Sequence, residues 1–554
     1  MKSQIDVLIE KILRQYSERK GFELPEGFGH ELVPSKDPAH GDFASNVAFK
    51  LTKFVRAKPN LIADELVLLL EKESGSEKAA GVRRVETAGG GFINFYLTQT
   101  SLGQILVEIH KKGERYGSSD FGKGRKVLLE FVSANPTGPL TIAHGRQAAV
   151  GDVLARILKA TGFAVSTEYY LNDAGRQMNL LGGSLWARYQ QELGREAAFP
   201  EEGYQGSYLV DIAKKLVGEK RDSLLSVKTS EAVDFCRKYA GDQIMRGIRE
   251  DLKTIRVHFD SYFNESSLYE RGAVDAALNF LTDHDFLYEK EGALWFRSTA
   301  FGDDKDRVVK KSTGEYTYLA PDIAYHRSKF ERGHQWLINL WGPDHHGYVP
   351  RLKAACQALG HPAHDMDIRI VQLTTLFRKG EPVRMSTRAG EFVTLRELYE
   401  EVGVDAARFF FVMRKIESHL DFDLELAKQK SQENPVYYLQ YAHARIAGLL
   451  RFAARPVNPK ANVARLDTPE ESEVIKVISK LPDVLVQASQ MLEPYRLADY
   501  LREVAAAFHK CYQLHRVVTE DNELTEARLL LADTARRVLR SGLELLGISQ
   551  PESM

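Results

Sequence analysis

The stretch Glu130-Phe-Val-Ser-Ala-Asn-Pro-Thr-Gly-Pro-Leu-Thr-Ile-Ala-His-Gly-Arg146 is the most informative part of the sequence, because it places a tight turn between a strand and a helix. The apolar run Val127–Val132 predicts a buried strand. Two prolines and a glycine predict the turn, and a helix follows over about 144–160 and ends at Gly162. This order of elements is typical of a doubly wound nucleotide-binding fold. We therefore predict an α/β protein with a parallel, Rossmann-like sheet.

The predicted start of the helix has the chemistry of an anion-binding site. Exposed backbone amides and the helix dipole favour a negative charge there, and His144 can donate a hydrogen bond to a phosphate oxygen. Ala143 and Gly145 are small enough to let the backbone approach a ligand. The same residues also fit an ordinary connection between a strand and a helix, with His144 as a capping residue.

Composition is that of an ordinary globular protein with more than one core. The 554 residues, of which 44% are hydrophobic and 27% charged, predict about three or four domains and argue against disorder or a membrane bundle. The first ten residues carry acidic side chains, which fits neither a signal nor a transit peptide. Three cysteines (Cys236, Cys356 and Cys511) are too few for a disulfide framework or a structural zinc site. We expect a reduced protein of the cytoplasm with no membrane partner.

The overall charge excludes a protein that coats nucleic acid, because 75 basic residues oppose 76 acidic ones and the net charge is -1. Positive charge is concentrated locally, since residues 428–465 contain seven Lys and Arg residues and the single acid Glu433. Such a region fits an RNA-binding surface, but it also fits a solvated face.

We predict four regions along the chain. Residues 1–110 form a small α+β domain, and a linker follows at Lys112–Lys126. Residues 120–390 form the Rossmann-like domain, with a mostly helical insertion at about 178–310. A connecting helical segment covers 391–430, and an all-α bundle covers 431–554.

Further strands of the parallel sheet are predicted from apolar and aromatic runs. They cover Val165–Leu171, Tyr316–Ala320, Trp336–Trp341 and Ile368–Leu373. From Leu395 onward the pattern is helical, and no strand is predicted.

Two further patterns have a weaker functional interpretation. Gly117-Ser-Ser-Asp-Phe-Gly-Lys-Gly124 is close to a P-loop, but it lacks the final Ser or Thr and precedes a strand instead of following one. The neighbouring His345 and His346 could suggest a metal site, but adjacent residues rarely present two imidazoles to one ion.

The stretch Glu130–Arg146 resembles the ATP-binding signature of class I aminoacyl-tRNA synthetases, in its arginyl-tRNA synthetase form. The class pattern is His-Ile-Gly-His, and this chain has Thr141-Ile-Ala-His144. Arg384-Met-Ser-Thr-Arg388 is similar to the second class signature, Lys-Met-Ser-Lys-Ser, whose cations stabilise the transition state. The resemblance extends over most of the chain through Asp42–Asn46, Glu168–Arg176, Tyr316–Asp322 and Trp341–Gly347.

The resemblance implies roles for residues of three kinds. The catalytic set is His144, Thr141, Arg384 and Arg388, and the ATP-binding set is Pro136, Thr137, Gly138, Ala143, Gly145, Asp344, His345, Met385 and Ser386. The arginine-binding set is Glu130, Ser133, Asn135, Tyr318 and Asp322; Glu130 and Asn135 would hold the amino and carboxylate end, and Tyr318 and Asp322 the guanidinium. From the residues alone, a salt-bridged Glu130 and an N-capping Asp322 remain alternatives.

The tRNA is expected to bind at both ends of the chain. Asn434 and Pro435 predict a clean helix start, and the helix offers aromatic rings for bases and arginines for phosphates. The resemblance places this bundle at the anticodon and the N-terminal domain at the outer corner of the tRNA. The expected contacts are Tyr437, Tyr441, Arg445, Arg451 and Tyr512.

The implied function is that of an arginine–tRNA ligase. It would use ATP with Mg²⁺ to activate L-arginine, release pyrophosphate and transfer arginine to the terminal ribose of tRNA(Arg), with no dedicated protein metal site. Two other hypotheses remain open: a synthetase for another amino acid, and a catalytically silent tRNA-binding relative, which the altered Thr141 and Ala143 suggest. Tests of charging with each amino acid would separate them. A monomer is the default expectation, since the sequence contains no hydrophobic seam.

Overall fold

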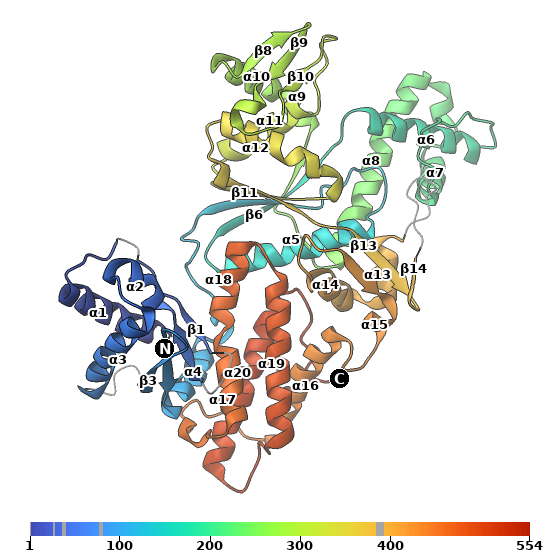
Figure 1. Cartoon of the computed structure of the whole chain (residues 1–554). Coiled ribbons are helices and arrows are strands. Elements are labelled where there is room, and N and C mark those ends of the chain that lie inside the picture. The colour runs from blue at the N-terminus through green and yellow to red at the C-terminus, as the bar shows by residue number, and fades with distance from the viewer. Residues whose placement is uncertain (1, 26–27, 36–39, 77–80, 384–392) are drawn as a thin grey trace.

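The computed structural model describes residues 2–25, 28–35, 40–76, 81–383 and 393–554. Its centre is a five-stranded parallel sheet with strand order β12-β11-β5-β6-β7 (Figure 1). The strands are β5 (Lys126–Glu130), β6 (Ala164–Leu171), β7 (Ser261–Asn264), β11 (Trp336–Trp341) and β12 (Met366–Ile370). The chain leaves β5 toward β6 and later returns to the other side of β5 as β11, so the two halves of the sheet separate at β5. Ligands of such sheets bind at the carboxyl ends of the strands beside this switch point.

Both faces of the sheet are covered by helices. Val127 and Leu129 of β5 point to the side of α5 (Ile142–Ala160), while Leu128 packs with residues of α11 (Leu319–Glu331) and α12 (Val349–Ala358). Figure 1 shows α5 between the sheet and the C-terminal bundle, with α11 and α12 on the other side. The predicted strand, turn and helix around Glu130–Arg146 are therefore confirmed, as are the strands predicted near β6, β11 and β12.

One predicted strand is wrong. Tyr316–Ala320 is not a strand, because α11 begins at Leu319 with Tyr318 as its N-cap residue, and only an isolated bridge joins Tyr316 to Lys310. Pro321 lies in the first turn of this helix, where a missing N–H costs nothing.

The region 178–310 contains strands as well as helices. Its helices are α6 (Arg176–Glu192), α7 (Ser207–Lys220), α8 (Thr229–Thr254), α9 (Ser266–Glu270) and α10 (Ala273–Asp283). The expected helical insertion is interrupted by β7, which extends the central sheet. A small antiparallel sheet follows, made of β8 (Leu287–Lys290), β9 (Ala293–Phe296) and β10 (Arg307–Lys310).

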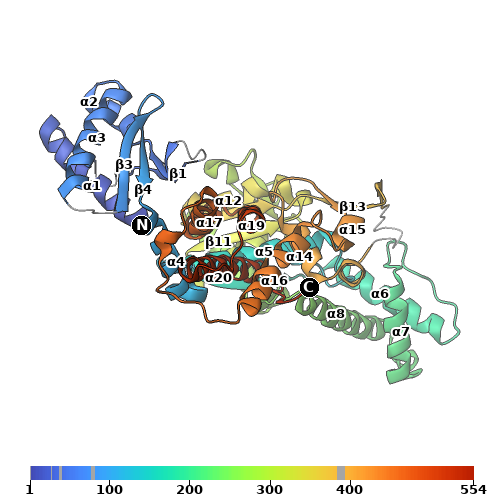
Figure 2. The same ribbon diagram turned by 90° about the horizontal axis from the view of Figure 1, so that it is seen from below.

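The N-terminal region is an antiparallel sheet of order β1-β2-β4-β3 with helices packed against it. Its elements are α1 (Lys2–Lys20), β1 (Leu32–Pro34), β2 (Phe43–Ser45), α2 (Val47–Val55), α3 (Pro59–Ser76), β3 (Val82–Ala88) and β4 (Phe92–Leu97), and α4 (Gln99–Lys112) leads out of it. This region lies beside the bundle, at the opposite end of the molecule from α6, α7 and α8 (Figure 2).

The segment after the sheet contains a strand that the sequence analysis did not predict. Here β15 (Leu420–Asp423) pairs in parallel with β13 (Thr374–Arg378), which also pairs with β14 (Glu381–Pro382). The expectation of no strand after Leu395 is therefore wrong. Leu420 and Phe422 are buried and alternate with exposed aspartates, but four residues are too few for a clear period. The helices are α13 (Leu395–Val402), α14 (Val404–Val412) and α15 (Leu424–Lys428).

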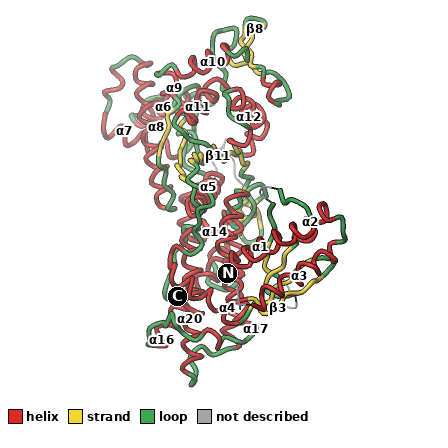
Figure 3. Tube along the Cα trace, turned by 90° about the vertical axis from the view of Figure 1, so that its left-hand side faces the viewer, coloured by secondary structure: helices red, strands yellow, loops and turns green. Residues whose placement is uncertain are grey.

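Five helices form the C-terminal bundle, which lies on the α5 side of the central sheet (Figure 3). They are α16 (Pro435–Ala453), α17 (Pro469–Ser479), α18 (Leu481–Met491), α19 (Tyr495–Leu514) and α20 (Asn522–Leu545). The predicted start of α16 is confirmed, because the Asn434 side chain accepts a hydrogen bond from the N–H of Val436. Within the described ranges, no helix combines the length and the apolar character that crossing a membrane requires.

A buried arginine connects the bundle to the sheet. Arg408 of α14 is 1% exposed and pairs with Asp152 of α5 at 2.5 Å. It also donates to the carbonyl oxygens of Ile255 at 2.7 Å and Leu546 at 3.0 Å. Gly547 has φ +67°, and a Cβ there would lie 2.2 Å from Nη2 of Arg408, so only glycine fits.

Candidate active site

The turn after β5 is strained and held in place by the next strand. Val132 has φ +67° and Ser133 has φ +39°, which is the left-handed region that residues with a side chain seldom adopt. The Ser133 hydroxyl donates to Oε1 of Glu130 at 3.1 Å and accepts the N–H of Tyr170 at 3.1 Å. The turn thus aims Glu130 and Ser133 at the carboxyl edge of the sheet.

Glu130 is buried and forms an ion pair. Its side chain is 7% exposed, and Oε2 lies 2.5 Å from Nζ of Lys329, which is fully buried. Asn339 of β11 accepts a second hydrogen bond from this ammonium at 3.1 Å. The salt bridge that the sequence left open for Glu130 is therefore present.

Asp322 lies inside the first turn of α11 and faces the same region. Its Oδ2 accepts a hydrogen bond from the hydroxyl of Tyr348 at 2.7 Å. Burial, together with the negative charges of Glu265 and Glu130, raises the pKa of Asp322 to about 7. The N-capping alternative is wrong, because the N-cap residue of α11 is Tyr318.

Glu265 is a third carboxylate of this cluster, and the sequence analysis missed it. It accepts hydrogen bonds from Tyr170 at 2.9 Å and Tyr269 at 3.3 Å, and burial raises its pKa. The pKa of Tyr170 is raised far above its ordinary value, first by burial and then by Glu265, Asp322 and Glu130. The three carboxylates therefore converge around one tyrosine ring. No periodic pattern marks Glu265, because it follows the short edge strand β7.

Two residues of the predicted arginine-binding set lie at the rim of this cluster. Tyr318 is 77% exposed at the N-terminus of α11. Asn135 is exposed in the turn after β5, and its amide donates to Gln177 of α6 at 2.7 Å. The structure thus brings Glu130, Ser133 and Asp322 together, and places Tyr318 and Asn135 outside that group.

His144 lies in the first turn of α5, where its ring contacts the N-cap residue Thr141. The N–H of Thr141 donates to Nδ1 of His144 at 3.1 Å. Burial lowers the pKa of His144 to about 4, against a smaller opposite effect of Asp344. The ring is therefore neutral near pH 7, and because Nδ1 accepts, the proton is on Nε2. Asp344 and His345 lie close to each other, 3.4 Å apart, and both are exposed.

The turn between β5 and α5 is braced by α7. The carbonyl oxygen of Thr137 accepts a hydrogen bond from Tyr208 at 2.5 Å, and a Cβ at Gly138 would lie 3.5 Å from the same hydroxyl. Pro136 is buried in this turn, while Ala143 is exposed at the first turn of α5.

Gly145 has a packing role beside the expected ATP-binding role. A Cβ at this position would lie 2.6 Å from Leu395 and 3.0 Å from Phe411, and the N–H of Gly145 is bonded to Thr141. Gly145 therefore allows α13 and α14 to pack against α5.

The second signature, Arg384, Met385, Ser386 and Arg388, lies outside the described residues. The chain that follows it returns to the start of α5, because Thr394 bridges Thr141 and the N–H of Leu395 donates to Leu140 at 2.8 Å. One flank of the signature is thus attached beside His144.

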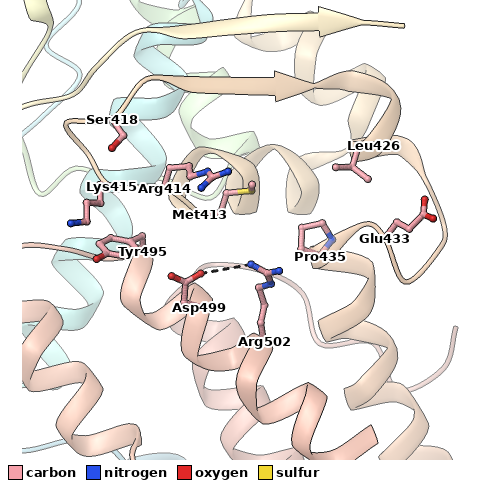
Figure 4. A pocket seen from close by; sticks show the side chains of 10 residues that line it. All are labelled: Met413, Arg414, Lys415, Ser418, Leu426, Glu433, Pro435, Tyr495, Asp499 and Arg502. Atoms are coloured by element: carbon pink, nitrogen blue, oxygen red, sulfur yellow. Dashed lines mark ion pairs between the residues drawn. The ribbon is translucent and has the colours of Figure 1, made fainter. Parts of the chain in front are cut away.

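A cavity of about 520 Å³ lies away from this cluster, between the segment after α14 and the bundle (Figure 4). Its walls carry Arg414, Lys415 and Arg502 against Glu433 and Asp499. Its other lining residues are Met413, Ser418, Leu426, Pro435 and Tyr495. The carbonyl oxygen of Lys415 accepts a hydrogen bond from the buried Arg146 of α5 at 2.9 Å, so the cavity wall is tied to the helix that starts at the active site.

Four of the five predicted tRNA contacts form one aromatic and cationic cluster on the bundle. Tyr437 and Tyr441 stack with centroids 6.2 Å apart, and Arg445 lies over the ring of Tyr512 at 4.3 Å. Arg451 lies further along α16 and is bonded to the carbonyl oxygen of Glu552 at 2.8 Å, so it does not join that cluster.

Comparisons with known families cover the whole chain. Three sequence profiles match: "Arginyl tRNA synthetase N terminal domain" over residues 3–97, "tRNA synthetases class I (R), catalytic domain" over 104–421 and "DALR anticodon binding domain" over 439–554.

Whole-chain relatives agree with these profiles. The chain is 48% identical to the arginine–tRNA ligase of Desulfosudis oleivorans, with 95% of each chain covered. It is 45% identical to that of Shouchella clausii, with 100% of this chain and 99% of the relative covered. The solved arginyl-tRNA synthetase of Thermus thermophilus has the same fold, with a TM-score of 0.77, 22% identity and 99% of each chain covered. These matches agree with the parallel sheet, and they show that the chain belongs to the arginyl-tRNA synthetases, a family of class I aminoacyl-tRNA synthetases.

Proposed function

We propose that this arginine–tRNA ligase binds the guanidinium of arginine between Asp322 and Glu265 and the amino group at Glu130. The observation that carries this proposal is the convergence of three carboxylates around Tyr170, beside the start of α5. Burial raises the pKa of both Asp322 and Glu265, and a guanidinium would supply, in a planar form, positive charge that favours their ionised forms.

The nucleotide is proposed to lie over the start of α5. Thr141 holds the ring of His144 by its backbone N–H, so Nε2–H is free to donate to a phosphate oxygen. Pro136, Thr137, Gly138, Asp344 and His345 surround this helix start, and Arg384 and Arg388 would add fixed positive charge. Magnesium would enter with ATP as the counter-ion of its phosphates.

The first step needs positioning more than base catalysis. The carboxylate of arginine is already anionic, so it attacks the α-phosphorus and pyrophosphate leaves without a proton transfer. A ribose hydroxyl of the tRNA then takes the arginyl group from the adenylate, and AMP leaves.

The tRNA is proposed to contact the bundle cluster of Tyr437, Tyr441, Arg445 and Tyr512. The cavity between α14 and α19 lies between this cluster and the sheet, and its cations suit the phosphates of the same RNA. We further propose that the enzyme acts as a monomer, because all of these residues come from one chain, and that it works in the cytoplasm.

Replacement of Asp322 tests the arginine site. Asp322→Ala should raise the KM for arginine at least about tenfold, because a charged hydrogen-bond partner is lost, and should leave the KM for ATP within about twofold. Both constants are measured by charging tRNA(Arg) with radiolabelled arginine. Equal effects on the two constants would mean that Asp322 does not bind the guanidinium.

A further inference from the structure

Lys329 is a fully buried cation that none of the roles above uses. It lies on α11, and its ammonium contacts Glu130 at 2.5 Å and Asn339 at 3.1 Å. Its Nζ also lies 4.2 Å from the centre of the Tyr325 ring. Two hydrogen bonds and one aromatic face satisfy this ammonium without water.

We propose that Lys329 is a positioning residue for amino-acid recognition: its ion pair holds Glu130 in the orientation in which the carboxylate can receive the α-ammonium group of arginine. This inference rests on the proposed role of Glu130. It assigns Lys329 no direct contact with the substrate.

The position of Lys329 is fixed from the side opposite Glu130. The amide of Asn339 accepts from Lys329 through Oδ1, so its Nδ2 donates to Nε2 of His326 at 2.9 Å. His326 then donates through Nδ1 to the carbonyl oxygen of Asp322 at 2.8 Å. Burial lowers the pKa of His326 well below its ordinary value, so the ring stays neutral. This relay fixes Oδ1 of Asn339 toward Lys329 and so supports the position of the ammonium beside Glu130.

The surroundings of Glu130 explain why a cation is needed there. Glu168 is its direct neighbour on β6, but Arg332 already pairs with Glu168 through two hydrogen bonds, at 2.6 and 2.8 Å. Within the described chain, Lys329 is the one cation bonded to Glu130. The titratable groups that face Glu130 are Lys329, Asp322 and Tyr325 on α11, Arg332 at its end, and Glu168 and Tyr170 on β6. Without Lys329, the buried carboxylate of Glu130 would lie beside two other acids, Asp322 and Glu168, without the ion pair that holds it in place.

The experiment uses the full-length enzyme with the substitutions Lys329→Met and Lys329→Arg. Arg332→Met is the matched control, because it removes a neighbouring ion pair from the same helix without touching Glu130. The probes are L-arginine, agmatine, which lacks the carboxylate, and 5-guanidinopentanoate, which lacks the amino group. The KM for arginine and ATP and the inhibition constants of both analogues are measured between pH 6 and 8.5.

The expected result is selective for the amino group. Lys329→Met should raise the KM for arginine and the inhibition constant of agmatine by about tenfold or more, and change those of 5-guanidinopentanoate and ATP by less than about twofold. Lys329→Arg should restore most of the affinity, and Arg332→Met should not show the selectivity.

Other outcomes overturn the proposal. Equal losses for all three arginine-like ligands would mean general distortion of the pocket, and no loss would mean that Glu130 needs no partner. If Lys329→Met does not fold, Lys329→Gln, which keeps a donor but removes the charge, takes its place with the same criteria. Glu130→Gln tests the role of Glu130 separately from that of Lys329. If Glu130→Gln weakens the binding of arginine no more than that of 5-guanidinopentanoate, the role of Glu130 itself is wrong. If Glu130→Gln shows the selectivity and Lys329→Met does not, only the role of Lys329 is rejected.

Discussion

Two ionisable side chains on either side of the turn after β5 are shifted by the same cause toward their neutral forms. Burial raises the pKa of Asp322 to about 7 and lowers that of His144 to about 4. For Asp322 this means that the ionised carboxylate is unfavourable in its buried position until a positively charged group binds beside it. For His144 the lowered pKa ensures a neutral ring whose proton is on Nε2.

Arginine binding should therefore depend on pH in the range where Asp322 titrates. The ionised form binds the guanidinium, so the KM for arginine should fall by up to about tenfold from pH 6 to pH 8. Steady-state charging kinetics across this range measure the effect, and Asp322→Asn should remove most of the slope. A slope that persists in the variant would assign the titration to another group.

The same shift affects stability with the opposite sign. Folding raises the pKa of the Asp322 carboxyl group from 3.8 to about 7, so the folded protein loses stability as the pH rises through that window. Without substrate at pH 8, Asp322→Asn should therefore raise the melting temperature, by about 2 °C or more, while it weakens arginine binding. At pH 5 the difference in melting temperature should be smaller, because the loss of stability accumulates between the ordinary pKa of 3.8 and about 7.

Glu265 is expected to share the guanidinium with Asp322. Glu265→Gln should raise the KM for arginine about tenfold or more and leave that for ATP unchanged, because the loss is confined to one charged hydrogen bond. Glu270, which is exposed at the end of the same short helix, offers the control Glu270→Gln. If both variants behave like the parent in charging assays, Glu265 does not contact the substrate.

Among the elements, α5 shows how close packing and catalysis share one helix. The small residue at Gly145 admits Leu395 and Phe411 from α13 and α14, while the neighbouring His144 is the residue proposed to bind a phosphate oxygen. Gly145→Ala should lower stability by about 1–3 kcal/mol through overpacking, measured by thermal or denaturant unfolding. Adding Leu395→Ala should recover part of this loss. If Gly145→Ala strongly raises the KM for ATP and Leu395→Ala does not reverse this rise, then Gly145 provides space for the nucleotide.

The elements that could be predicted are those whose pattern is local. The strand β5 is apolar from Val127 to Leu129, and its one acid, Glu130, is predicted as a site residue because a charge in such a strand needs a reason. The apolar and aromatic residues of Tyr316–Ala320 have the pattern of a strand, and only tertiary packing makes the second half of this segment the start of α11. The strand β15 exists because β13 supplies its hydrogen bonds.

The missed site residues are missed for a related reason. Lys329 lies 199 residues after Glu130 in the sequence, and no spacing rule connects them. Glu265 likewise reaches Tyr170 only because β7 pairs with β6. Single carboxylates and lysines outside regular patterns become site residues only through the topology of the sheet.

In the whole molecule, the N-terminal region is attached to the bundle through a small number of polar contacts. Asp42 pairs with Lys476 of α17 at 2.6 Å and also accepts the N–H of Leu97 at 2.5 Å. Tyr116 donates to the carbonyl oxygen of Ser479 at 3.2 Å. If the tRNA contacts both regions, their relative position affects tRNA binding and not arginine binding.

Lys476→Met should therefore raise the KM for tRNA(Arg) about threefold or more, as expected for loss of a partly buried ion pair, with unchanged KM values for arginine and ATP. Charging kinetics at varied tRNA concentration measure this effect. Lys510, an exposed lysine of α19, provides the control Lys510→Met. Equal changes in all three constants would indicate loss of folded protein instead.

Arg408 has a consequence for biosynthesis. Its guanidinium needs the carbonyl oxygen of Leu546 and the bare backbone of Gly547, which the ribosome adds more than a hundred residues later. Until those residues emerge, the growing chain carries an incompletely satisfied cation beside α5, so the catalytic region cannot complete its packing during translation. Prematurely terminated chains should accordingly be recognised by proteases as unfinished, which would spare the cell an enzyme that activates arginine but cannot select its tRNA.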